Sequence, residues 1–212
     1  MSIQMDGVTE ASAFQEAYSW LKQRIRDGRL AGGTRIKAED VAEELGMSRM
    51  PVREAIRQLS SEGLITLRLN RGAVVTALTS DDMREILEMR AALEGLAARR
   101  AVQRAQPADL EELKEDLRRL NAVNDDMDLW ISRHDRLHER IAEMAGAPRL
   151  AAEIRQLRTA MEPCLRLSVA GPRLAEAMSD HARLVEALAS GDPERAEICM
   201  REHVEETARA ML

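Results

Sequence analysis

The chain contains four histidines, and all of them fall in its C-terminal half. His134 and His138 stand four residues apart, so on a helix both rings leave the same face. His181 and His203 lie on two later segments with helical spacing. Three helices could therefore bring four imidazoles to one point, as helical bundles do at metal sites. The pattern indicates a divalent transition metal, with zinc or nickel preferred; the alternative is four satisfied core or surface side chains.

A second set of residues could read DNA. Arg49, Arg53 and Arg57 recur every four residues, so on a helix their guanidinium groups point the same way. The apolar residues of this stretch fall on the opposite face, and they are Val52, Ile56 and Leu59. Arginine can bind guanine O6 and N7 in the major groove or clamp phosphates. A stripe of this kind alone could also be a solvated helix face.

The elements around the arginine stripe favour a DNA-binding fold. Residues 1–12 lack periodicity and are expected to form a frayed tail. Gly46 suits a tight turn, and Ser48 could cap the next helix through its hydroxyl. The expected order is helices over 14–26, 38–45 and 48–61, a strand over 64–67, a turn at 70–72 and a return strand over 73–77. Three short helices followed by a hairpin predict a winged helix-turn-helix.

Beyond Thr79 the pattern is helical throughout. Six helices are expected over 80–104, 107–124, 126–145, 147–169, 173–190 and 192–211. Asp192 and Pro193 suit the start of the last one. The fold class is therefore mainly α: a winged helix-turn-helix over 1–78 and an antiparallel all-α bundle over 79–212.

Composition and charge agree with this division. Hydrophobic residues make up 45% and charged residues 32%, as in globular proteins rather than disordered chains. Neither a signal pattern nor a membrane-length apolar run occurs, so a cytoplasmic protein without membrane contact is expected. The net charge is −6 overall. It is +1 over residues 1–78 and −7 over 79–212, with +3 within 45–78. One short basic segment in an acidic chain is typical of a DNA-binding protein with a large regulatory domain.

The stretch from Ile25 to Thr79 resembles the DNA-binding domain of GntR-family regulators. The resemblance rests on "GRLAGGTRI", "VAEELGMSRMPVREAIRQLSSEGLI" and "NRGAVVT". It implies that six residues lie at the DNA, namely Ser48, Arg49, Met50, Pro51, Arg53 and Gly72. Arg57 joins them from the stripe and Arg71 from the hairpin tip. Met50 stands where threonine is common, and Glu39 where some members have arginine, so the operator sequence is left open.

The rest of the chain resembles the FCD sensor domain of the FadR subfamily, close to its VanR-like, six-helix group. "DRLHERIAEMAGAPRL" and "SDHARLVEALASGDPERAEICMREHV" carry the likeness. Metal-binding members use an Asp four residues before a His, and then two more His. His138, His181 and His203 match the histidines, whereas His134 occupies the Asp position. Asp135 would point about 100° away around the helix.

Arg90 and Glu94 are four residues apart and could form a helix-surface ion pair. The resemblance instead implies that Arg90 faces an effector pocket, where a small carboxylate would bridge it to the metal.

The leading interpretation is a DNA-binding regulator that acts as a repressor. It would be a homodimer on double-stranded operator DNA, controlled by a small organic acid. One alternative is a direct metal-ion sensor, in which the ion itself is the effector. Another is a metal-dependent enzyme, which is disfavoured because no nucleophile–base pair stands out in the sequence.

Overall fold

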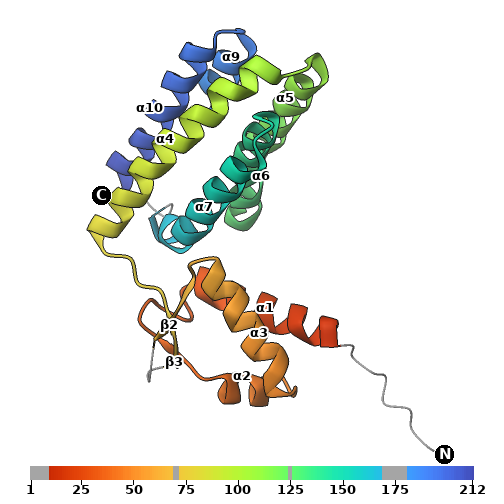
Figure 1. Ribbon diagram of the computed structural model, residues 1–212, viewed down its shortest axis with the longest axis vertical. Helices are drawn as coiled ribbons and strands as arrows, with labels where there is room; N and C mark the ends of the chain where they lie inside the picture. Colours follow the sequence, from red (N-terminus) through yellow and green to blue (C-terminus); the bar gives the residue numbers. More distant parts are fainter. Residues whose placement is uncertain (1–9, 69–71, 124–125, 169–180) are drawn as a thin grey trace, which may run out of the picture. The chain divides into compact units, whose positions relative to one another are not determined.

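The computed structural model describes residues 10–68, 72–123, 126–168 and 181–212 (Figure 1). It divides into two compact units, Met1–Thr79 with Glu162–Leu167 and Ser80–Met161 with Ser168–Leu212. The sequence expectations for most of the N-terminal tail and for the first half of the helix over 173–190 lie outside the described residues.

The first unit is built on three helices, α1 (Glu10–Arg26), α2 (Ala38–Glu44) and α3 (Arg49–Ser61). Leu21 of α1 and Leu59 of α3 are completely buried in their shared core. Gly46 adopts a φ of 63° between α2 and α3, a conformation that glycine adopts without steric cost. Ser48 stands at the N-cap of α3, but its hydroxyl makes no capping hydrogen bond, so that expectation is wrong.

A small antiparallel sheet completes the unit. Its strands are β1 (Arg35–Ile36), β2 (Ile65–Arg68) and β3 (Gly72–Val75), in the order β1-β3-β2. β2 and β3 form the predicted hairpin, with Ile65 opposite Val75. β1 was not expected, because two residues are too few to show strand alternation. Three helices and this hairpin confirm the winged helix-turn-helix.

The second unit is helical throughout its described residues, as predicted. Its helices are α4 (Ser80–Arg104), α5 (Pro107–Asn121), α6 (Met127–Met144), α7 (Pro148–Ser168, of which Glu162–Leu167 are assigned to the first unit), α9 (His181–Ala189) and α10 (Pro193–Met211). Figure 1 shows α4 and α10 side by side along the bundle. Gly95 permits this approach, because a Cβ there would lie 2.7 Å from Cγ of Arg201. The Asp192 carboxylate caps α10 as expected, accepting from the amides of Glu194 and Arg195.

None of the helices within the described ranges has both the length and the apolar character needed to cross a membrane.

Candidate DNA interface and metal centre

The exposed face of α3 carries the arginine stripe. Side chains of Arg49 and Arg53 are 65% and 57% exposed, and Arg57 is exposed one turn further on. The apolar residues of the opposite face are buried, as the spacing predicts, and they are Val52, Ile56 and Leu59. Met50 is 59% exposed beside the arginines. Pro51, in contrast, is buried in the first turn of α3, so its ring does not share the exposed face.

A groove runs from α3 to the sheet and contains basic residues that sequence reasoning missed. Arg53 and Arg57 line it from α3. Arg35 of β1, Lys37 just after β1 and Arg68 of β2 also line it. Arg35 could not be placed from the sequence because β1 was not expected. Arg68 directly follows the expected strand. Its two-residue spacing from Thr66 could have placed both side chains on the same face of the sheet. The groove therefore presents five cationic side chains along a single surface of the first unit.

One acidic side chain stands among these cations. Glu39, in the first turn of α2, has Oε1 3.4 Å from Nη1 of Arg49 and 3.7 Å from Nη2 of Arg53. All three side chains are largely exposed, so the pairs contribute little to folding. Glu39 therefore places one negative charge beside two arginines of the exposed face.

The wing supplies one further residue of the expected set. Gly72 begins β3 with a φ of 75°, and a Cβ there would lie 3.9 Å from Nε of Arg35. A side chain would therefore be strained and would also contact Arg35. Ser48 is exposed at the start of α3. Arg71, expected at the hairpin tip, lies outside the described residues.

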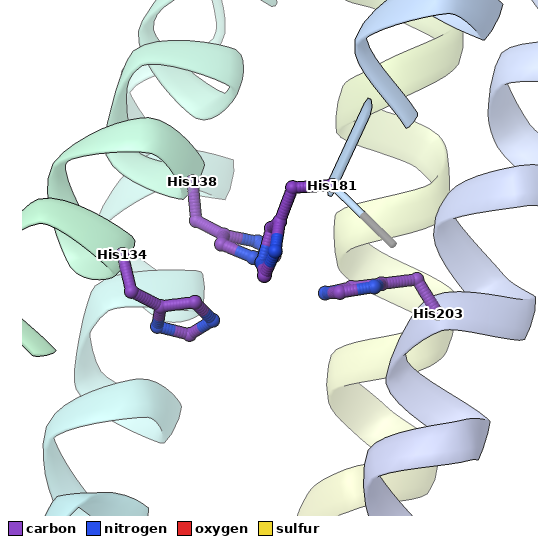
Figure 2. Close-up of side chains that lie close together, drawn as sticks. All are labelled: His134, His138, His181 and His203. Atoms are coloured by element: carbon purple, nitrogen blue, oxygen red, sulfur yellow. The ribbon is translucent and has the colours of Figure 1, made fainter. Parts of the chain in front are cut away.

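In the second unit, the four histidines form one buried cluster (Figure 2). His134 and His138 extend from α6, His181 begins α9, and His203 comes from α10. One ring nitrogen of each lies within 4.8 Å of the others. A bound metal spaces such nitrogens by about 3.3 Å in a tetrahedron and about 4.1 Å across an octahedron. The upper limit of 4.8 Å is about 0.7 to 1.5 Å wider than these values, so the rings would move closer together on binding an ion.

The hydrogen bonding of the rings also fits a metal centre. Nε2 of His138 and Nδ1 of His203 are buried and have no hydrogen-bond partner among the described residues. Burial lowers the pKa of His203 to about 3. Burial also holds the pKa of His138 well below the usual histidine range, and nearby Arg158 lowers it further. Neutral rings with unused lone pairs are the form in which histidine binds a metal.

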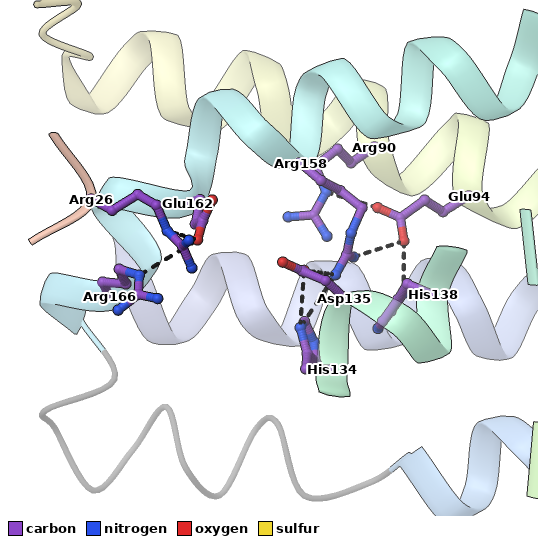
Figure 3. Close-up of polar contacts among 9 residues, drawn as sticks. All are labelled: Arg26, Arg90, Glu94, His134, Asp135, His138, Arg158, Glu162 and Arg166. Atoms are coloured by element: carbon purple, nitrogen blue, oxygen red, sulfur yellow. Dashed lines mark hydrogen bonds and ion pairs between the residues drawn. The ribbon is translucent and has the colours of Figure 1, made fainter. Parts of the chain in front are cut away.

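A buried polar network adjoins the cluster (Figure 3). Nε of Arg90 donates to Oε1 of Glu94 at 2.7 Å, and both side chains are buried. The alternative of a helix-surface pair is therefore wrong. Oε2 of Glu94 lies 2.9 Å from Nδ1 of His138. Arg158 of α7, which sequence reasoning missed, contacts Glu94 and His134 and binds Oδ1 of Asp135 at 2.6 Å.

Comparison with known proteins gives the same division of the chain. Residues 14–75 match the family described as bacterial regulatory proteins, gntR family, and residues 85–206 match the FCD domain. The probable D-xylose utilization operon transcriptional repressor of Paenarthrobacter nicotinovorans is 28% identical over 93% of this chain and 88% of its own length. The gluconate operon transcriptional repressor of Bacillus subtilis is 31% identical over 78% of this chain and 68% of its own.

A solved structure, that of E. coli McbR/YncC, has a TM-score of 0.78 at 28% identity and covers 94% of this chain and 97% of its own. A winged helix-turn-helix joined to a helical domain defines a class, the DNA-binding transcriptional regulators. Within that class, the chain belongs to the GntR family and carries an FCD domain.

Proposed function

We propose that the protein is a repressor whose operator affinity is set by a small carboxylate effector bound in a metal-containing sensor domain. The observation that most directly supports this proposal is that one chain combines an exposed arginine face on α3 with four buried, converging histidines. Two relatives are named as operon repressors, which supports the direction of control.

In the proposed complex, α3 enters the major groove. Arg49, Arg53 and Arg57 face the base edges, where a bidentate arginine–guanine contact is the commonest specific one. Arg35 and Arg68, on the sheet side of the groove, fit phosphate contacts that hold the register. Ser48, Met50 and Gly72 complete the proposed DNA surface; buried Pro51 would act by fixing the first turn of α3.

In the proposed sensor, His134, His138, His181 and His203 hold one divalent ion, with zinc or nickel preferred by imidazole ligands. Four neutral rings leave the ion's two positive charges uncompensated, so an anionic effector is favoured there. Arg90 would hold the far end of a carboxylate, shared with Glu94. One relative is named for the gluconate operon, and gluconate is a small carboxylate, which supports this class of effector.

Two alternatives make different predictions. In a direct metal sensor, the ion alone would change operator affinity. In a metal-dependent enzyme, turnover would need a nucleophile and a base near the cluster. The DNA-binding first unit favours a regulator over an enzyme.

The experiment starts from an operator selected in vitro from random duplexes with the full chain. Binding is then titrated with Zn²⁺ or Ni²⁺, with and without a panel of small carboxylic acids. We expect one acid to weaken operator binding at least about tenfold, and only in metal-loaded protein, because a ligand acts through its different affinities for two states. Release by metal alone would favour the direct sensor. Failure to select any sequence would overturn the regulator itself.

A further inference from the structure

The four histidines are not equivalent, because opposite kinds of hydrogen-bonding group hold the two that come from α6. His138 faces a carboxylate, Glu94, whereas His134 faces a guanidinium, Arg158 (Figure 3). A carboxylate accepts hydrogen bonds and a guanidinium only donates them. The two neighbours therefore place the ring proton on different nitrogens of the two histidines.

His138 is preset to bind a metal. Two guanidinium groups pair with Glu94: Nε of Arg90 donates to Oε1 at 2.7 Å, and Nη1 of Arg158 lies 3.4 Å from Oε2, so the group is a carboxylate. Nδ1 of His138 therefore donates to Oε2 of Glu94 across 2.9 Å. The proton stays on Nδ1, and Nε2 keeps its lone pair. Carboxylate–histidine pairs orient metal ligands in this way.

His134 is held in the opposite sense. Nη2 of Arg158 lies 3.2 Å from Nδ1 of His134, whereas Oδ1 of Asp135 lies farther from it, at 3.6 Å. Because arginine can only donate, the closer contact is a hydrogen bond when Nδ1 accepts. In the neutral ring the proton is then on Nε2, and the one free lone pair is already engaged. A metal could bind Nδ1 only by displacing Arg158. It could bind Nε2 only if the proton moved to Nδ1, where Arg158 would oppose it. Oδ1 of Asp135, 3.6 Å from Nδ1, could then accept that proton.

Arg158 is well placed to compete. Its side chain is only 10% exposed, and Glu94 and Asp135 fix it by ion pairs of 3.4 and 2.6 Å. Both carboxylates could stay paired with the guanidinium after it left His134. The release of His134 would therefore not leave a buried charge without a partner. Trp130 stacks on the His134 ring with centroids 4.9 Å apart, which keeps the ring in place during the exchange.

We propose that His138, His181 and His203 form a standing metal site, and that His134 is a conditional fourth ligand for which Arg158 and the metal compete. This inference rests on the metal centre of the proposed function. It gives Arg158 the role of a positioning residue that sets the coordination number. An anion that binds Arg158 would release His134 to the metal, so anion and metal would each strengthen the binding of the other.

The first test measures Co²⁺ affinity of the full chain by competition with a chromophoric chelator. Arg158→Met removes the competitor, and Arg90→Met is the matched control, because it removes the same charge from the same network without touching a histidine. Both changes should tighten binding by removing a nearby cation. Arg158→Met should tighten it about tenfold more than the control, since it also removes a charge-assisted hydrogen bond to the ligand.

The second test uses the wild-type protein, and histidine variants serve only to assign the NMR signals to residues. Long-range proton–nitrogen NMR of the metal-free protein should show His138 protonated at Nδ1 and His134 at Nε2. Added Zn²⁺ should change the His134 pattern and leave the Nδ1 proton of His138 in place. Equal effects of the two arginine variants, or His134 protonated at Nδ1 without metal, would overturn the inference and leave the metal centre intact. A wild-type protein that binds no Co²⁺ would overturn both.

Discussion

Among single residues, Arg53 is the best test of the proposed DNA surface, because it belongs both to the arginine stripe and to the groove. It lies in the second turn of α3, lines the groove and sits 3.7 Å from the Glu39 carboxylate.

Arg53→Ala should weaken binding to the selected operator by about 1–3 kcal/mol, the usual value of a bidentate base contact. Arg29→Ala is the control, because it removes the same charge from an exposed position of the same unit that does not line the groove. Anisotropy titrations at fixed salt would compare the two. Equal losses would mean that Arg53 contributes only general charge.

Residue-scale prediction from the sequence succeeded where contacts are local. The faces of α3 follow from helical geometry alone, so exposed Arg53 and buried Leu59 could be assigned from their spacing. Arg158 could not be found, because its partners lie 23 and 64 residues away in the chain. The spacing of His134 and His138 indicated a shared face, whereas His181 and His203 could be placed only through the family resemblance.

Among elements, α1 and α3 share an apolar core and are also joined by one partly buried polar cluster. Glu62, just after α3, accepts from the Tyr18 hydroxyl at 2.9 Å and from Nζ of Lys22 at 3.0 Å, both on α1. Gln58 donates to the same carboxylate at 2.9 Å. Burial alone would raise the pKa of Glu62, but the hydrogen bonds from Gln58, Lys22 and Tyr18 leave this pKa below its usual value.

The lowered pKa of Glu62 determines how its contribution to folding stability changes with pH. The folded carboxylate binds its proton less tightly than the unfolded one, so its contribution is present above about pH 4.3 and lost as pH falls below it. Glu62→Gln should lower the free energy of unfolding by about 1 kcal/mol at pH 7, with a smaller difference near pH 3.5. Urea titrations followed by Trp20 fluorescence, in a Trp130→Phe background, would measure both.

The exposed pair of Glu44 with Arg24 provides the control, since Glu44→Gln should change the stability little. If Glu62→Gln and Glu44→Gln behaved alike at pH 7, the cluster would add no measurable stability to the packing of α1 on α3.

Some elements could be predicted from the local sequence pattern, and others could not. Long periodic segments such as α4 could be predicted to their ends, because many turns repeat the same signal. β1 has only two residues, and it forms by pairing with β3, which is distant in the sequence. The local sequence pattern therefore does not predict it. Ser48 was predicted as a side-chain cap from residue type, yet its hydroxyl direction depends on surroundings that the type does not encode.

For the whole molecule, one winged domain is a small DNA-binding module. Single modules of this size bury about 600–1,000 Å² on DNA, less than tight specific complexes need. We expect a two-fold dimer on a pseudo-palindrome, with half-sites spaced by whole helical turns. Sedimentation velocity of free protein and of its operator complex should show two chains in each, and a duplex with one half-site should bind much more weakly. A monomer in both states would contradict the dimer.

The position of the four histidines has one further consequence, for protein turnover. An ion held between α6, α9 and α10 would tie together stretches that are distant in the sequence. A tie of this kind raises the cost of local opening, because the binding free energy is lost whenever a ligand leaves. Proteases act on opened chains. Metal supply would then influence how long each copy of the regulator survives, and so how many copies compete for an operator.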